Sequence, residues 1–229
     1  MIYQSTSKFK FVDRKYNKTL VLIPGWATDY RIFYFLDIPY NYLFPLNFSP
    51  MEFQKNLKEY LGNNNIKEVS ILGFSLGGFI ASEFVSEYCG IIPEIFLVGI
   101  RKKYKKYEIE QTIKSFKKNK SESLGKFYSM CILEQKQNLF WKKLFKDYTN
   151  DFSLQFLVKT LLYLGEKEIQ PEKINHIKKI VLIHGQNDKI APLNEAIEIK
   201  NSLKNAEIKI IKDTGHLVFS QENNSYFYG

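Results

Sequence analysis

Residues 68–78 read EVSILGFSLGG, an apolar run that passes directly into a glycine-rich turn around Ser75. The pattern predicts a strand over Glu68–Leu72, a sharp turn over Gly73–Gly78 and a helix over Phe79–Tyr88. The turn has the form Gly-x-Ser-x-Gly, in which the glycines leave room for strand and helix to close on each other. The serine hydroxyl is then lifted above the sheet as a nucleophile. The alternative is an ordinary glycine-rich turn without a chemical role.

The rest of the chain alternates between strand and helix patterns. Its strand-like runs are apolar without a polar residue at every second position, which is typical of a parallel sheet covered on both faces. We therefore predict an α/β fold with its core in residues 1–100 and 166–229 and an inserted helical cap in residues 101–165. The further predicted strands are Thr19–Ile23, Tyr40–Phe44, Ile92–Gly99, Lys179–Ile183 and Glu207–Ile211, and the further predicted helices are Pro50–Leu61 and Leu193–Leu203.

The composition favours a packed globular protein. Of the 229 residues, 45% are hydrophobic and 16% aromatic, which argues against disorder. The two cysteines form neither a disulfide framework nor a metal-ligand pattern, so we expect no metal and no cofactor. The first twelve residues lack the apolar segment of a signal peptide, and the apolar run of residues 91–100 is too short for a membrane span. These features predict a cytoplasmic enzyme.

The positive charge is concentrated in the predicted cap. Residues 101–146 contain 14 lysines and arginines against 4 acidic residues, whereas the remainder of the chain holds 19 basic and 20 acidic residues. An AT-rich genome would enrich lysine throughout, so it does not explain the clustering. The segment is either a surface that binds an acidic partner or simply a solvated helical face. It carries no recognised nucleic-acid motif, and we expect no nucleic-acid partner.

Two further residues complete a catalytic pattern with Ser75. Asp188 follows the predicted strand that ends at Ile183, and His216 follows the last predicted strand, so both belong at the edge of the sheet that carries Ser75. There His216 would take the proton of Ser75, while Asp188 would orient the imidazole and stabilise its cation. Asp213 is a weaker candidate for the acid.

The other candidates for this chemistry are few. His184 is expected to be structural at the end of a strand, and His176 to lie in a loop. Cys131 has no histidine near it in the sequence, so a thiol nucleophile is not expected. Two backbone amides are expected to stabilise an oxyanion, that of Leu76 at the start of a helix and that of Trp26 in the loop after the first strand. The Trp26 ring is expected to cover the floor of the site, or else to pack in the core.

The motifs Pro24-Gly25-Trp26, the turn at Ser75, the Asp188 loop and Gly215-His216 resemble those of small α/β-hydrolases. In particular they resemble the pimeloyl-acyl-carrier-protein methyl ester esterases of biotin synthesis. The chain order Ser, Asp, His is the one that this fold uses. Those esterases usually have His-Gly-Trp where this chain has Pro24-Gly25-Trp26, and often tryptophan in place of Phe74. The resemblance covers both halves of the core but does not extend to the cap.

The resemblance implies a serine carboxylic ester hydrolase that cleaves the methyl ester of a pimeloyl group on an acyl carrier protein. It also implies that Trp26 and Leu76 supply the oxyanion amides and that the basic cap docks the acidic carrier. Long-range attraction between opposite charges would assist such docking. An acyl thioesterase or a general small-ester carboxylesterase is the alternative enzyme. A non-catalytic protein on this fold that binds nucleic acid or an anionic membrane through the basic cap is the alternative outside enzymes.

Overall fold

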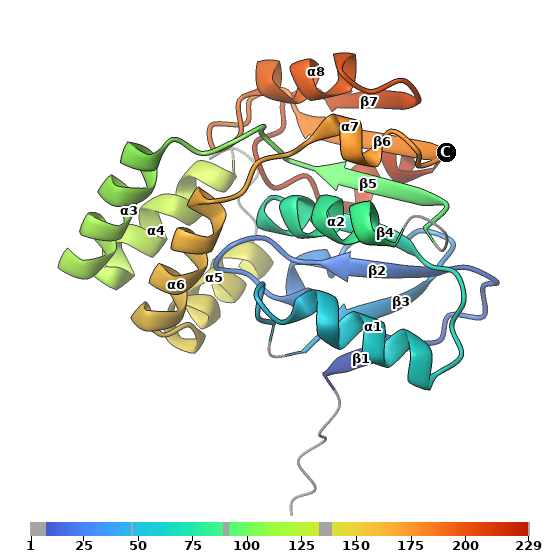
Figure 1. Cartoon of the computed structure of the whole chain (residues 1–229). Coiled ribbons are helices and arrows are strands. Elements are labelled where there is room, and N and C mark those ends of the chain that lie inside the picture. The colour runs from blue at the N-terminus through green and yellow to red at the C-terminus, as the bar shows by residue number, and fades with distance from the viewer. Residues whose placement is uncertain (1–7, 47, 89–91, 133–138, 229) are drawn as a thin grey trace, which may run out of the picture.

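The computed structural model describes residues 8–46, 48–88, 92–132 and 139–228. Its centre is a seven-stranded sheet in the order β1-β3-β2-β4-β5-β6-β7 (Figure 1). All neighbouring strands are parallel except β1 and β3, which pair antiparallel at one edge. The strands are β1 Phe9–Val12, β2 Thr19–Ile23, β3 Asn41–Pro45, β4 Ser70–Phe74, β5 Glu94–Val98, β6 Lys179–Gly185 and β7 Ala206–Ile211.

Helices connect the parallel strands and cover the sheet. On one face α2 contacts both α1 and α7. The connections that contain α1 and α2 run along the sheet toward the β7 edge, whereas the connection from β2 to β3, which contains η1, runs toward the β1 edge. Since crossovers between parallel strands are right-handed, η1 lies on the opposite face of the sheet from α1 and α2. There Phe33 of η1 and Phe227 of η4 both pack on Phe219, with ring centroids 5.0 and 5.8 Å away. The bounds are α1 Phe53–Asn63, α2 Leu76–Glu87, α7 Pro171–Ile174, α8 Leu193–Asn201, and the 3-10 segments η1 Tyr30–Phe33 and η4 Gln221–Phe227.

The segment predicted as the cap, residues 101–165, forms helices beside the sheet. The arrowheads of β2 and β5 point toward these helices in Figure 1, so they lie at the carboxyl ends of the parallel strands. This is the edge at which open α/β sheets place their sites. The helices are α3 Lys106–Lys118, α4 Lys120–Cys131, α5 Leu139–Asp151 and α6 Leu154–Gly165.

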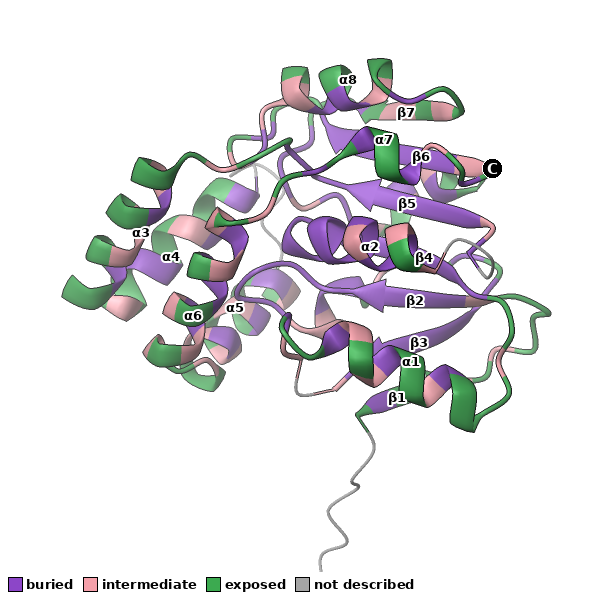
Figure 2. Cartoon of the chain, viewed as in Figure 1, coloured by how far each residue is buried: buried purple, intermediate pink, exposed green. Residues whose placement is uncertain are grey.

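Burial is most complete in the strands next to the predicted site. β4 and β5 are buried along their whole length, and α2 is buried at most positions because it lies between the sheet and its neighbours (Figure 2). Burial on all sides explains why these segments are apolar without alternation. By contrast, β1 buries only Phe9 fully, and so short a pattern was not recognised in the sequence.

The start of the cap differs from the prediction. The sequence pattern was interpreted as helical from residue 101, but α3 begins at Lys106. The chain before it is extended, and Lys103 forms an antiparallel bridge with Glu168. Arg101 fixes this crossing, because its side chain is buried and pairs with Glu108 at 3.3 Å and Glu195 at 2.8 Å. One residue thus connects the cap helix α3 with α8 of the core.

Candidate active site

Ser75 occupies the turn between β4 and α2 in a conformation that non-glycine residues rarely adopt. Its φ and ψ are 52° and −115°. The strain is held by hydrogen bonds at both ends, since its amide donates to Val98 (2.8 Å) and its carbonyl accepts from Gly78 (2.8 Å). Residues kept in such sparsely populated conformations concentrate at functional sites.

The glycines around Ser75 are required by close backbone contacts. A Cβ atom on Gly73 would lie 2.3 Å from the carbonyl oxygen of Gly77, and one on Gly77 would lie 2.2 Å from that of Ile23. Any larger residue would push α2 away from β4 or β2. The steric reason for the Gly-x-Ser-x-Gly pattern, predicted from the sequence, is confirmed.

His216 and Asp188 form a buried pair at the same edge of the sheet. Nδ1 of His216 lies 2.7 Å from Oδ2 of Asp188. The other carboxylate oxygen accepts the backbone amides of Ile190 and Ala191, each at 2.8 Å. Burial alone would raise the pKa of Asp188, but the attraction and hydrogen bond of His216, with the amide of Ala191, hold that pKa below its usual value. The carboxylate is therefore charged and fixed in orientation.

The alternative acid, Asp213, is placed differently. It is exposed, and its backbone has a φ of 47°. His184, by contrast, is completely buried at the end of β6, where its Nε2 lies 2.7 Å from the carbonyl oxygen of Ala191 and 3.4 Å from Oδ2 of Asp188. Burial lowers the pKa of His184, so its ring is neutral. Through its contact with the Ala191 carbonyl, the ring holds the loop that carries Asp188 in place. His176 is exposed in the turn after α7.

Ser75 and His216 line one small cavity between the core and the cap. The core contributes Gly25, and the cap contributes Phe127 and Phe145. The cavity measures about 10 Å³, which is room for about one water molecule. Among the described residues Nε2 of His216 has no hydrogen-bond partner, so the Ser75 hydroxyl is not bonded to it. In enzymes without substrate such catalytic hydrogen bonds are often long and tighten on binding.

Trp26 lines this cavity together with Ser75 and His216, and its ring is also packed against the cap helices. Its indole Nε1 donates to the carbonyl of Leu157 in α6 at 3.1 Å. The ring meets Phe116 and Phe127 edge to face at 5.1 and 4.9 Å. The Trp26 ring is thus held by residues of the cap helices α3, α4 and α6. The next residue, Ala27, has a φ of 55°, a second strained position beside the cavity.

Two residues at the site were missed from the sequence. Cys131, at the end of α4, lines the cavity with Ser75 and His216. Burial raises the pKa of its thiol, and Asp188 raises it further, so the thiol stays protonated. Tyr104 also reaches the site. Burial and the charge of Asp188 raise its pKa, and the charge of Arg101, followed by an interaction with the Ser75 side chain, opposes them. Both come from the cap, whose folding over the sheet has no local sequence signal.

Comparison with known sequences identifies the family of this chain. Residues 51–223 match the profile of a family described as the alpha/beta hydrolase fold. The chain belongs to the α/β-hydrolase family. This α/β-hydrolase is also similar to the AB hydrolase superfamily protein YisY of Bacillus subtilis, at 21% identity over 179 residues. That alignment covers 73% of this chain but spans only 66% of the relative.

Solved structures show the same fold. An esterase from Exiguobacterium antarcticum superposes with a TM-score of 0.82 at 15% identity, over 95% of this chain and 91% of that one. A bromoperoxidase from Bacillus anthracis gives 0.82 at 16% identity, over 96% and 91%. A thermophilic esterase from Thermogutta terrifontis gives 0.80 at 13% identity, over 96% and 89%. At these identities the likeness establishes the α/β-hydrolase architecture.

Two features are absent from the described residues. In that part of the chain no group of three or more histidine, cysteine, aspartate or glutamate side chains is placed to hold a metal ion. Nor is any helix there long and apolar enough to cross a membrane.

Proposed function

We propose that this protein is a serine carboxylic ester hydrolase with Ser75 as nucleophile, His216 as general base and Asp188 as the residue that orients His216. The observation that carries the proposal is one cavity lined by both a serine on a strained strand–helix turn and a histidine bonded to a buried aspartate. This is the division of roles in Ser-His-Asp hydrolases.

The proposed reaction has two halves. Oγ of Ser75 attacks the ester carbonyl carbon while Nε2 of His216 takes its proton. The tetrahedral intermediate collapses, the C–O bond to the alcohol breaks, and His216 returns the proton to the leaving alcohol. A water molecule, deprotonated by His216, then attacks the acyl-serine and releases the carboxylic acid and Ser75.

The oxyanion of each intermediate is proposed to bind two backbone amides. Leu76 is the first residue of α2, so its amide lies at the positive end of the helix dipole. Trp26 lies beside the cavity on the opposite loop, where the strain at Ala27 and the hydrogen bond from the Thr28 hydroxyl to the Gly25 carbonyl (3.0 Å) fix the backbone. Donors fixed before the reaction stabilise the developing charge without reorganisation.

For the substrate we propose the methyl ester of a pimeloyl group on an acyl carrier protein. The support is the sequence resemblance together with the basic residues of the cap, 14 against 4 acidic residues over residues 101–146. A carrier protein is acidic and would be attracted to that surface. An acyl thioesterase or a general small-ester carboxylesterase uses the same Ser75 chemistry and differs only in the leaving group. A non-catalytic anion-binding protein would not need the His216–Asp188 pair.

The test of the nucleophile is labelling with a fluorophosphonate probe, read by mass spectrometry. We expect one adduct, on Ser75, and none in Ser75→Ala. Turnover of p-nitrophenyl acetate by that variant should fall by about 10⁴–10⁶, because nucleophile and base act as one unit. Ser86→Ala, in the same helix α2, is the matched control and should be labelled and active. An adduct elsewhere, or more than a tenth of the activity in Ser75→Ala, would overturn the proposal.

The finer substrate proposal needs its own experiment. Purified protein is incubated with pimeloyl-carrier methyl ester, and release of methanol is compared with that from methyl pimelate. Restored growth of a biotin-requiring esterase mutant is the matching cellular assay. Turnover of p-nitrophenyl esters without release of methanol from the carrier substrate would leave the serine hydrolase proposal standing and remove the pimeloyl one.

A further inference from the structure

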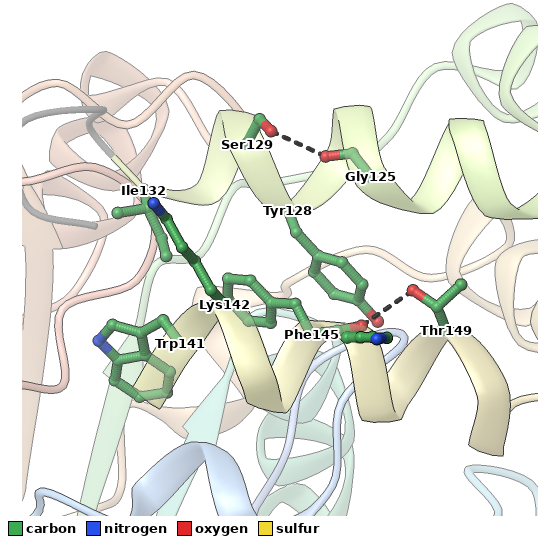
Figure 3. A pocket seen from close by; sticks show the side chains of 9 residues that line it. Gly125, Tyr128, Ser129, Ile132, Trp141, Lys142, Phe145 and Thr149 are labelled. Atoms are coloured by element: carbon green, nitrogen blue, oxygen red, sulfur yellow. Dashed lines mark hydrogen bonds between the residues drawn. The ribbon is translucent and has the colours of Figure 1, made fainter. Parts of the chain in front are cut away.

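A second hollow lies inside the cap, between α4 and α5 (Figure 3). It measures about 230 Å³ and is open because the α4 side carries small residues, Gly125 and Ser129. A Cβ atom added to Gly125 would meet nothing within 4 Å. The Ser129 hydroxyl is bonded back to the Gly125 carbonyl at 2.9 Å, as Figure 3 shows, so it leaves the space free. We call this hollow the cap groove.

A pair of stacked rings is shared by the cap groove and the cavity at Ser75. Tyr128 and Phe145 line both hollows, with ring centroids 4.4 Å apart and planes at 5°. Tyr128 is fixed, because it is buried and its hydroxyl donates to the carbonyl of Ala27 at 2.7 Å. Phe145 is partly exposed and is therefore the less enclosed ring of the pair. A rotation of Phe145 would join the two hollows into one channel that ends at Ser75.

The groove combines an apolar lining with positive charge. Ile132 and Trp141 contribute apolar surface, and the exposed Lys142 and Lys146, one turn apart on α5, also line the groove. Neither lysine has an ion-pair partner among the residues that the structure describes. A volume of about 230 Å³ suits an acyl chain of medium length. The positive charges of Lys142 and Lys146 favour an anionic group at the end of that chain.

We propose that the cap groove binds the acyl chain of the substrate and that Lys142 and Lys146 bind a carboxylate at the far end of the chain. The ester group then reaches Ser75 past Phe145, which determines the accepted chain length. This inference rests on the proposed serine hydrolase function and assigns a substrate class to that same site: esters of α,ω-dicarboxylic acids with one free acid group. It competes with the carrier-bound substrate proposed above, because a pimeloyl group on a carrier has its second carboxyl in the thioester and therefore has no free carboxylate.

Filling the groove tests where the chain binds. Gly125→Leu adds a side chain whose Cβ atom meets nothing within 4 Å, and leucine also favours the helix by about 1 kcal/mol over glycine. The measurement is the ratio of kcat/KM for p-nitrophenyl octanoate to that for p-nitrophenyl acetate. We expect this ratio to fall at least tenfold in Gly125→Leu. Gly62→Leu is the matched control, since its added Cβ also meets nothing within 4 Å, and it should keep the wild-type ratio.

Substitutions of Phe145 and of the two lysines test the entry to the cavity at Ser75 and the proposed carboxylate site. Phe145→Ala, which opens the partition, should raise the octanoate-to-acetate ratio. For the lysines, the measurement is the ratio of kcat/KM for the p-nitrophenyl monoester of suberic acid to that for p-nitrophenyl octanoate. The double variant Lys142→Ala/Lys146→Ala should lower this ratio by about fivefold or more, because each exposed ion pair between a lysine and the carboxylate contributes only a modest free energy. Lys114→Ala/Lys117→Ala, on α3, is the control. If ester turnover is normal but the groove variants leave these ratios unchanged, the groove proposal is wrong and the serine hydrolase proposal stands.

A binding measurement keeps the groove testable without turnover. Suberic acid monoamide and octanamide lack an ester, and their binding is followed by fluorescence of Trp141 in a Trp26→Phe background. We expect tighter binding of the anionic amide, abolished by Gly125→Leu and weakened by the double lysine variant. Binding with this pattern in a protein that labels with no fluorophosphonate would retain the groove and remove the hydrolase. Equal binding of both amides, insensitive to Gly125→Leu, would overturn the groove.

Discussion

Nδ1 of His216 lies 2.7 Å from Oδ2 of Asp188, although Asp213 is far closer to His216 along the chain. The two acids differ in their surroundings, because Asp188 is buried and accepts two backbone amides whereas Asp213 is exposed. Only Asp188 is placed to hold the imidazole in one tautomer. The proposed assignment of the acid therefore makes a direct comparison possible.

We predict that Asp188→Asn lowers kcat for p-nitrophenyl acetate by about 10⁴, as such a change does when the histidine loses its orienting acid. Asp213→Asn should stay within about twofold of wild type. Steady-state kinetics of the two variants, with circular dichroism to verify folding, is the measurement. The reverse ranking would move the acid to Asp213.

A site residue could be predicted from the sequence where its role depends on residues close to it in the chain. The Ser75 turn is a local pattern, since the close contacts of Gly73 and Gly77 lie within one strand–helix unit and β2. Asp188 and His216 were predictable because each directly follows a parallel strand, and such strands end at one edge. Cys131 and Phe145 reach the cavity only through the packing of the cap, which no spacing in the sequence encodes.

The edges of the fold were less predictable for a related reason. β1 pairs antiparallel with β3 and buries a single residue fully, so its sequence carries almost no strand pattern. Lys102 and Lys103 were grouped with the cap charges, yet both lie near Glu168, at 3.9 and 3.3 Å. A count of charges along the chain cannot reveal that an acid beyond the segment faces them.

Cys131 gives a prediction about reactivity. Because burial raises the pKa of its thiol, the reactive thiolate is scarce in the folded protein at neutral pH. We expect iodoacetamide to leave Cys131 unmodified in the native state and to modify it fully in urea, as read by mass spectrometry. Since the folded pKa is raised, the contribution of this thiol to stability is complete below about pH 8.5 and is lost as the pH rises further. Rapid modification of the native protein would contradict this.

Glu94 gives a prediction about stability without activity. It is buried at the start of β5, opposite the edge that carries Ser75, and it accepts hydrogen bonds from Tyr40 and Ser70 (3.1 Å to Ser70). Lys179 lies 3.4 Å from it but is partly exposed. Glu94→Ala leaves these groups without their acceptor, so the free energy of unfolding in urea should fall by about 2–3 kcal/mol.

The matched control for Glu94 is Glu207→Ala, whose ion pair with Lys209 at 3.7 Å is exposed on the glutamate side. It should change the free energy of unfolding by less than about 1 kcal/mol. Both variants should keep wild-type kcat/KM for p-nitrophenyl acetate under folding conditions. A large loss of activity in folded Glu94→Ala would mean that the two edges of the sheet are coupled.

The basic surface gives the last prediction. Lys117 and Lys118, in the last turn of α3, are exposed and have no ion-pair partner among the described residues, in contrast to Lys102 and Lys103. If this surface docks an acidic carrier, Lys117→Glu/Lys118→Glu should lower kcat/KM for a carrier-linked ester by about tenfold, because two attractive contacts become repulsive.

The same double variant should hydrolyse p-nitrophenyl acetate as wild type does, since a small neutral ester does not need that surface. The carrier reaction should also slow with added salt, because exposed charges are screened beyond about 8 Å at physiological ionic strength. Lys200→Glu/Lys204→Glu, on and beyond the end of α8, controls for net charge. If the carrier-to-acetate ratio falls equally in both double variants, the attraction belongs to the charge of the whole protein. If it falls in neither, the lysines of α3 only solvate the cap, and docking of a carrier there is wrong.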